Sequence, residues 1–173
     1  MGVGGVVTAA ALAGAVAVGA SGLGPHDDGA WRGLGLRVVD RVTRADGDCV
    51  ANSFGQVREL LTTAPCTSLS RLLVTLADDK GTVVAVSVAW VEFAERDTAG
   101  AFKRVEDVHG TGDITPLSAR LLLRDEITFT AHHYDSELLG TTVVVAEAEA
   151  VEGAATPEFL HRVTEVAVLT PRP

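Results

Sequence analysis

One short polar string offers the first candidates for chemistry. It reads HHYD at residues 132–135 and falls in a predicted strand, where neighbouring side chains point to opposite faces. His132 and His133 therefore cannot chelate one ion. His132 and Glu147 could form half of a metal site, but the sequence places no third ligand. We expect no metal and no cofactor, and we interpret His132 and Tyr134 as part of a solvated hydrogen-bonding face.

Two carboxylates extend this face. Glu147 and Glu149 lie on one side of the next predicted strand, about 6.7 Å apart along it. If strands 127–134 and 141–151 pair in the register that sets polar residues against polar residues, Thr130 lies opposite Glu147, and His132 lies diagonal to Glu147. The predicted binding face comprises His132, Tyr134, Glu147 and Glu149. The carboxylate spacing is also compatible with general acid/base catalysis, although any alternating strand produces it.

Other motifs give weaker signals. The Gly-rich loop His109–Asp113 follows a predicted helix instead of preceding one, so no helix N-terminus is available there to hold a phosphate. We interpret the loop as a turn. None of the serines lies in a G-x-S-x-G elbow.

Two cysteines bracket one predicted helix. Ser53 and Gln56 have the spacing of a capping box, and Pro65 ends the helix. Such a helix is about 16 Å long, and its flanking residues can span about 23 Å, so Cys49 and Cys66 can meet. The sequence thus predicts a disulfide and an oxidising compartment. Two buried free thiols in a cytosolic protein are the alternative.

The elements that must position these residues follow an uncharged leader. Residues 1–24 carry no charged side chain and are long enough to cross a bilayer as a helix. We expect a membrane anchor through residues 2–24, or a secretory signal with a small-residue site at Val18-Gly19-Ala20. A Gly/Ala-rich leader without structure is the third option. Residues 25–34 are predicted to be a linker in which Trp31 either lies at the membrane surface or packs on the domain.

Residues 35–173 are predicted to form a single α+β domain, an antiparallel sheet with helices packed on it. A strand–hairpin–strand–helix unit occurs twice, 59 residues apart, and suggests a duplicated β-hairpin–α unit. The predicted strands are 36–42, 69–76, 82–93, 127–134, 141–151 and 166–170. One predicted helix starts near Asp97 and buries Ala101, Phe102, Val105 and Val108; the other starts at Thr156 and Pro157. Both faces of strand 82–93 are apolar, which predicts a central strand.

Composition limits the classes of function. The 173 residues carry a net charge of −9, which argues against nucleic acid as a partner because a phosphate backbone needs a basic surface. The hydrophobic fraction of 47% excludes wholesale disorder. The length suits one ordinary domain.

Several features together resemble uncharacterised exported or membrane-anchored proteins of actinobacteria. They are the apolar leader, the helix between Cys49 and Cys66, Ala89-Trp90-Val91, Gly110-Thr111-Gly112-Asp113 and His133-Tyr134-Asp135. This resemblance implies no activity. The layout is also loosely similar to sandwich domains of the PsbP/Mog1 type, which implies an accessory or binding role.

We therefore expect an extracytoplasmic, non-enzymatic domain that binds a protein or a cell-envelope component. A secreted hydrolase is one alternative, which a pocket joining His132 to Glu147 would favour. The other is a structural domain that forms a homodimer to cover Val88 and Trp90, which an exposed apolar patch there would favour.

Overall fold

A computed structural model describes residues 27–122, 125 and 127–173. The predicted leader, residues 1–24, lies outside them. The elements run α1 (Asp27–Gly33), β1 (Arg37–Asp46), α2 (Gly55–Thr63), β2 (Ser68–Ala77), β3 (Val83–Glu92), α3 (Arg96–Glu106), the 3-10 helix η1 (Ala119–Leu122), β4 (Tyr134–Leu139), β5 (Thr142–Glu152) and α4 (Pro157–Ala167). The fold is α+β, as predicted.

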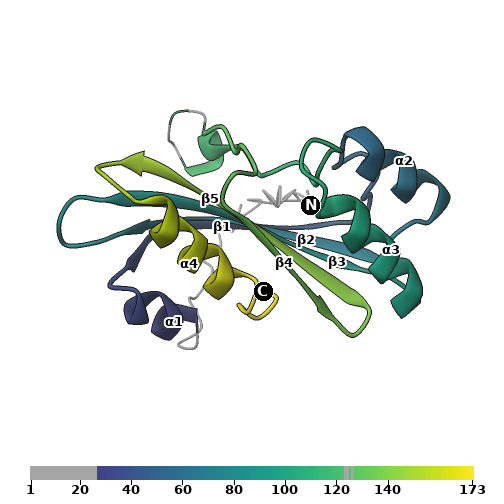
Figure 1. Ribbon diagram of the computed structural model, residues 1–173, viewed down its shortest axis with the longest axis horizontal. Helices are drawn as coiled ribbons and strands as arrows, with labels where there is room; N and C mark the ends of the chain where they lie inside the picture. The colour runs from purple at the N-terminus through teal and green to yellow at the C-terminus, as the bar shows by residue number, and fades with distance from the viewer. Residues whose placement is uncertain (1–26, 123–124, 126) are drawn as a thin grey trace, which may run out of the picture.

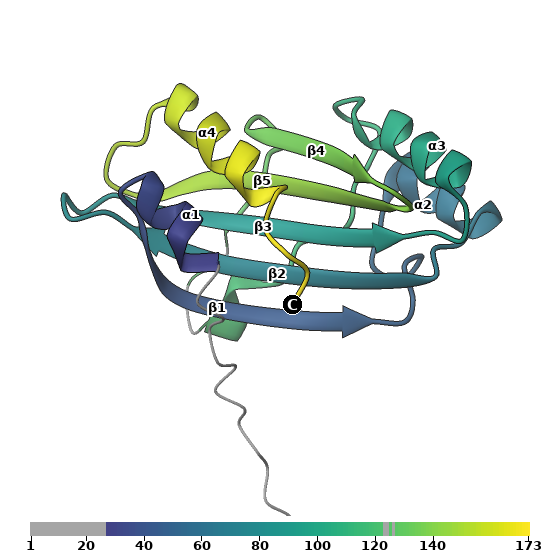
Figure 2. The same ribbon diagram turned by 90° about the horizontal axis from the view of Figure 1, so that it is seen from below.

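The five strands form one antiparallel sheet in the order β1-β2-β3-β5-β4. β3 lies in the centre, as predicted from its two apolar faces. Both faces of the sheet are covered: α1 and α4 pack on one, and α2, α3 and the segment around η1 pack on the other (Figures 1 and 2). A buried β-branched strand of this kind gains its stability from side-chain packing on both sides.

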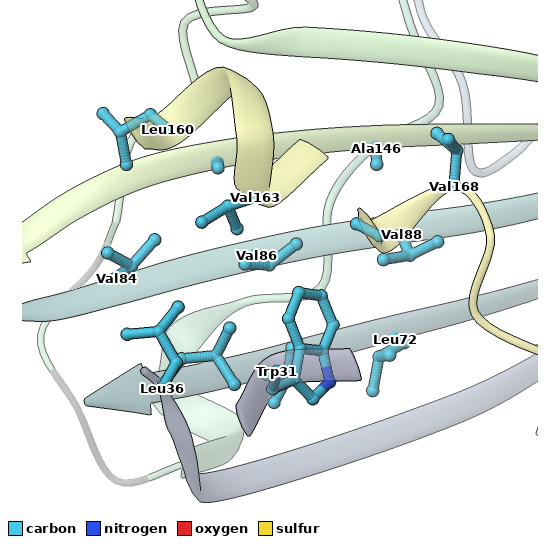
Figure 3. Close-up of a cluster of buried hydrophobic side chains, with 14 of the residues drawn as sticks. Trp31, Leu36, Leu72, Val84, Val86, Val88, Ala146, Leu160, Val163 and Val168 are labelled. Atoms are coloured by element: carbon cyan, nitrogen blue, oxygen red, sulfur yellow. The ribbon is translucent and has the colours of Figure 1, made fainter. Parts of the chain in front are cut away.

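The first face carries a core of alternating strand residues. Val84, Val86 and Val88 of β3 point into it and meet α4 and Trp31 of α1 (Figure 3). α4 starts as predicted: the Thr156 side chain accepts a hydrogen bond from the Phe159 N–H, and Pro occupies the first turn.

The predicted linker at residues 25–34 is wrong for most of its length. Asp27–Gly33 form helix α1, and the Trp31 side chain is only 1% exposed. Trp31 therefore packs on the domain instead of lying at a membrane surface. Burial of a large aromatic side chain can hold even a two-turn helix in place. This stabilisation comes from tertiary contacts, so the polar residues around Trp31 gave no sign of it in the sequence.

On the second face, a disulfide joins Cys49 to Cys66, with 6.3 Å between the two Cα atoms. It bridges the two ends of the α2 segment, as predicted, and indicates an oxidising, extracytoplasmic setting. The predicted capping box is wrong: the residue before α2 is Phe54, and the Ser53 hydroxyl instead donates to the Val50 carbonyl. Within residues 27–122, 125 and 127–173, no helix is long and apolar enough to span a bilayer.

Two predicted strands are also wrong. Residues 127–133 are irregular and β4 begins only at Tyr134, while residues 166–170 form the end of α4 and a turn. β4 and β5 meet in a tight turn at Gly140, so Tyr134, not Thr130, lies opposite Glu147. The register follows from the short hairpin, because a longer loop would leave backbone groups unpaired.

A hairpin followed by a helix does occur twice, but the structure does not confirm a duplicated unit. α3 and α4 pack on opposite faces of the sheet. Val88 and Trp90 point to the α4 face and are covered there, being 0% and 2% exposed. The Trp90 indole N–H also donates to the Thr170 carbonyl at 3.3 Å. The apolar patch that would have favoured a homodimer is therefore filled by the chain itself.

Candidate functional site

Helix α3 carries a carboxyl group on its buried side. Its buried residues are Ala99, Phe102 and Glu106, which follow one another at helical spacing. We predicted that Ala101, Phe102, Val105 and Val108 form the buried stripe. Phe102 is fully buried, but Ala101 and Val105 are half-buried and Val108 is 53% exposed. The helix is rotated so that Glu106, only 5% exposed, takes a core position.

The loop after α3 is fixed by close backbone contact with the start of α2. The Phe54 N–H donates to the Asp113 carbonyl at 3.0 Å, and the Gln56 N–H donates to Thr111. Gly55 and Gly112 lie where the two segments cross, both with positive φ, and a Cβ on either would collide with the other segment's backbone. The predicted turn at His109–Asp113 therefore holds the Asp113 side chain in one position.

Strand β5 supplies the third carboxyl. Val143, Val145 and Glu147 point to the α2–α3 face, whereas Ala146 and Ala148 point to the α4 face. Glu147 lies between Ser87 of β3 and Tyr134 of β4 and is only 5% exposed. Alternation along the strand thus directs the Glu147 carboxyl into the core on the α2–α3 face, which Glu106 also enters.

The irregular segment 127–133 closes over β5. The Ala131 N–H donates to a Glu147 carboxyl oxygen at 2.7 Å, and the Thr130 N–H and hydroxyl both donate to Glu149. Ala131 has a φ of 56°, which is unusual for a residue other than glycine. The two glutamates therefore hold this segment by accepting its backbone N–H groups.

Three carboxyls meet here: Glu106 and Glu147 are buried and Asp113 is partly buried, and both glutamates lie close enough to Asp113 to affect its pKa. Burial is the largest cause of a raised pKa in each: about 7 for Glu106, about 9 for Asp113 and about 8 for Glu147. Their mutual repulsion raises the values of Asp113 and Glu147 further. In this carboxyl cluster (Glu106, Asp113 and Glu147), the neutral acid form avoids the cost of burying a charge.

A second polar group borders the carboxyl cluster. The Tyr134 hydroxyl donates to Asp107 at 3.0 Å, and Lys103 pairs with the same carboxylate at 2.8 Å. Burial alone would raise the pKa of Asp107, but hydrogen bonds from Lys103, Ser136 and Tyr134 outweigh it and lower the pKa. Burial raises the pKa of the Tyr134 phenol. The pKa of Asp107 is thus shifted in the opposite direction to those of Glu106, Asp113 and Glu147.

Two adjoining cavities open onto the carboxyl cluster. The larger, which we call the acidic cavity, has a volume of about 280 Å³, and its walls include Phe54, His109, Asp113, Phe129, Ala131 and Glu147. The smaller, of about 50 Å³, shares His109, Asp113 and Ala131 with it and reaches Glu106 and Tyr134. Titratable groups with perturbed pKa values beside a cavity are the usual marks of a functional site.

A larger hollow, of about 480 Å³, lies by the β2–β3 turn and the start of α4. Its Asp78 carboxylate is already used by the turn, where it accepts from the N–H groups of Lys80 and Thr82. We therefore place the candidate site at the acidic cavity.

The four residues of the predicted binding face do not form an open surface. Glu147 is buried, Tyr134 and Glu149 are partly buried, and His132 is exposed, with its ring centroid 5.5 Å from that of His109. Tyr134 and Glu147 do lie opposite each other. His109, not His132, borders the acidic cavity.

Sequence reasoning missed Glu106 and Asp113. A signal for Glu106 was present, because it follows Phe102 by one helical turn on the side that packs. No local signal marks Asp113, whose burial depends on the crossing of two distant loops. Within residues 27–122, 125 and 127–173, no three His, Cys, Asp or Glu side chains are arranged to hold a metal ion.

Comparisons with known proteins add no relative. No protein-family model matches the chain, and no curated protein or solved structure is significantly similar to it. The resemblances to actinobacterial exported proteins and to PsbP/Mog1 sandwiches stay predictions.

Proposed function

We propose that the chain is an extracytoplasmic binding domain, secreted or anchored through residues 2–24, that takes part of a protein or cell-envelope component into the acidic cavity. The disulfide between Cys49 and Cys66 supports the setting. The observation that carries the binding role is a hollow that opens onto buried polar groups, with Asp113 and Glu147 in its wall.

The size of the acidic cavity favours a small group. Its volume of about 280 Å³ is at the lower end for ligand pockets, which begin near 300 Å³. It suits one side chain or one small head group. Two apolar side chains stand exposed beside the two cavities: Phe54 is 50% exposed and Val108 is 53% exposed. These two side chains form an apolar rim, against which a partner could bury apolar surface around its polar contact with the cavity.

The test is sedimentation of the protein with isolated cell-envelope material. Phe54→Ala should weaken binding because it removes the apolar rim, and the loss of one buried aromatic contact typically corresponds to about tenfold or more in affinity. Leu139→Ala is the matched control, because Leu139 is also 50% exposed but lies at the β4–β5 turn. Equal binding by wild type and Phe54→Ala would discard the acidic cavity as the site.

A hydrolase remains the second candidate, and one observation favours it. Asp113 and Glu147 line a cavity and have raised pKa values, as a general acid requires. A panel of chromogenic esters and glycosides would decide: turnover that is lost in Glu147→Gln and peaks between the pKa values of the pair would support catalysis. No turnover by the wild type would leave the binding role.

A further inference from the structure

The walls of the two cavities are strongly acidic. Glu106, Asp107, Asp113 and Glu147 all contribute to them. Among the described residues that line either cavity, none is Lys or Arg, and His109 is the one basic side chain. Lys103, which lies nearby, is held by Asp107 and Ser136. The described lining therefore favours a cationic ligand over an anionic one.

Glu106 has hydrogen-bonding capacity to spare. Its side chain is 95% buried, and neither carboxyl oxygen meets the geometry of a hydrogen bond with a described residue. The Asp113 carboxyl and the Ile114 N–H lie close enough to lower its pKa, but burial outweighs them and raises it. Burying acceptors without donors costs free energy, so a ligand rich in donors would gain by reaching this wall.

The acidic cavity also has apolar lining. Phe54, Pro116 and Phe129 line it together with Asp113 and Glu147. An aromatic ring can attract a cation across its face, and apolar surface can pack an alkyl stem. A cavity lined by both apolar side chains and carboxyls matches an alkyl ammonium group, which has an apolar stem and three N–H donors with no acceptor.

We propose that the acidic cavity binds the protonated amino group of an alkyl amine, with the ammonium on Asp113 and Glu147, next to the smaller cavity that Glu106 lines, and the stem along Phe54 and Phe129. The source of this group is a free amine or the side chain of a lysine on a partner. This inference rests on the binding role proposed above, and it names the chemistry of the occupant.

Binding should release a proton. The ligand arrives as R–NH₃⁺ and stays charged, and one neutral carboxyl of the cluster gives its proton to solvent to become the counter-ion. Charge is conserved: one cation enters the site and one proton leaves it. Because burial raises the pKa values of Asp113 and Glu147 to about 9 and about 8, the affinity for the amine should rise as pH increases from 6 to 8.5.

The experiment is isothermal titration calorimetry of the full chain. n-Butylamine and Nα-acetyl-lysine N-methylamide are the two probes, and n-butanol is the uncharged counterpart. Runs in phosphate and in HEPES differ in buffer ionisation enthalpy and report proton release. Both probes should bind if the site accepts any alkyl ammonium group, whereas a clear preference for the lysine probe would identify a protein partner as the source.

Two amide variants and one control complete the design. Asp113→Asn and Glu147→Gln keep the shape but cannot become anions, so each should weaken amine binding about tenfold or more. Glu158→Gln, an exposed carboxylate at the start of α4, should leave binding unchanged. A thermal melt of each variant confirms that it is folded.

Three results would overturn the inference: n-butanol binding as well as n-butylamine, amine binding without proton release, or Ca²⁺ binding in place of the amine. Its failure can be separated from that of the proposed function. Envelope binding that still depends on Phe54, without amine binding, would leave the binding role intact and remove only the ammonium ligand.

Discussion

The carboxyl cluster makes stability depend on pH in a direction opposite to that of most carboxylates. Its three members have raised pKa values because they are buried, so the folded state keeps protons that the unfolded chain has released. A raised carboxyl pKa contributes stability that is fully present below the unfolded value, near 4, and is lost as pH rises through the folded value. We therefore predict that the domain becomes less stable between pH 6 and pH 8.

The magnitude follows from the number of extra protons bound. Each proton held by the folded state and not by the unfolded state corresponds to a fall of about 1.4 kcal/mol in the free energy of unfolding per pH unit. One such proton over two pH units gives about 3 kcal/mol. For a domain of this size that lowers Tm by about 6–12 °C. Further shared protons would steepen the fall.

The assay is urea unfolding followed by circular dichroism at half-unit steps from pH 5.5 to 8.5. Glu147→Gln mimics the protonated acid and retains an acceptor for the Ala131 N–H. Its stability relative to wild type should increase by about 1.4 kcal/mol per pH unit from pH 5.5 to about 8. Glu158→Gln is the control: hydrogen bonds with its own backbone N–H and with Thr156 lower its pKa, so it titrates below this window.

Two results would refute this reasoning. One is a wild-type stability that is constant or increases from pH 6 to pH 8. The other is a Glu147→Gln curve that runs parallel to wild type, which would mean that the fall in stability comes from other groups.

Two further predictions concern the framework of the site. Gly112→Ala should lower the free energy of unfolding by several kcal/mol, because its Cβ would collide with the Phe54 carbonyl. Gly110→Ala, also at positive φ but in open space, should lower it by about 1–2 kcal/mol. Urea midpoints compare the two variants, and equal losses of stability would contradict the crossing of the α3 loop with the start of α2. Replacing both Cys49 and Cys66 by Ser should lower the free energy of unfolding by about 3 kcal/mol, given the sequence separation of 17 residues. Dithiothreitol should lower the urea midpoint of wild type to that of the variant and leave the variant unchanged. A wild type whose midpoint is insensitive to the reductant would argue against the disulfide.

The parts of the fold that depend on local pattern could be predicted from the sequence. β2 and β3 follow from β-branched composition and a turn at Asp78–Gly81, and α4 follows from Thr156 and Pro157. The disulfide follows from the reach of the chain on either side of α2. In each case neighbouring residues carry the information.

The site could be predicted only in part, because its geometry depends on distant contacts. Alternation correctly placed Glu147 and Glu149 on one side of β5, but their partners are backbone N–H groups of an irregular segment, not side chains of a strand. That segment imitates a strand in its pattern because Ile127 and Phe129 also pack against the core. Asp113 becomes buried only when the loop after α3 crosses the start of α2.

The division of the sheet into two covered faces affects how the protein can be handled. α1, α4 and the C-terminus lie on one face of the sheet (Figure 2). There Arg172 donates to Ser70 and pairs with Glu92. The acidic cavity lies on the other face. If the protein is coupled to a sensor chip through a tag at the C-terminus, the chip therefore lies on the side of the sheet away from the acidic cavity. Immobilised in that orientation, the protein presents its hollow side to the flowing solution, and a bulky analyte can approach without obstruction.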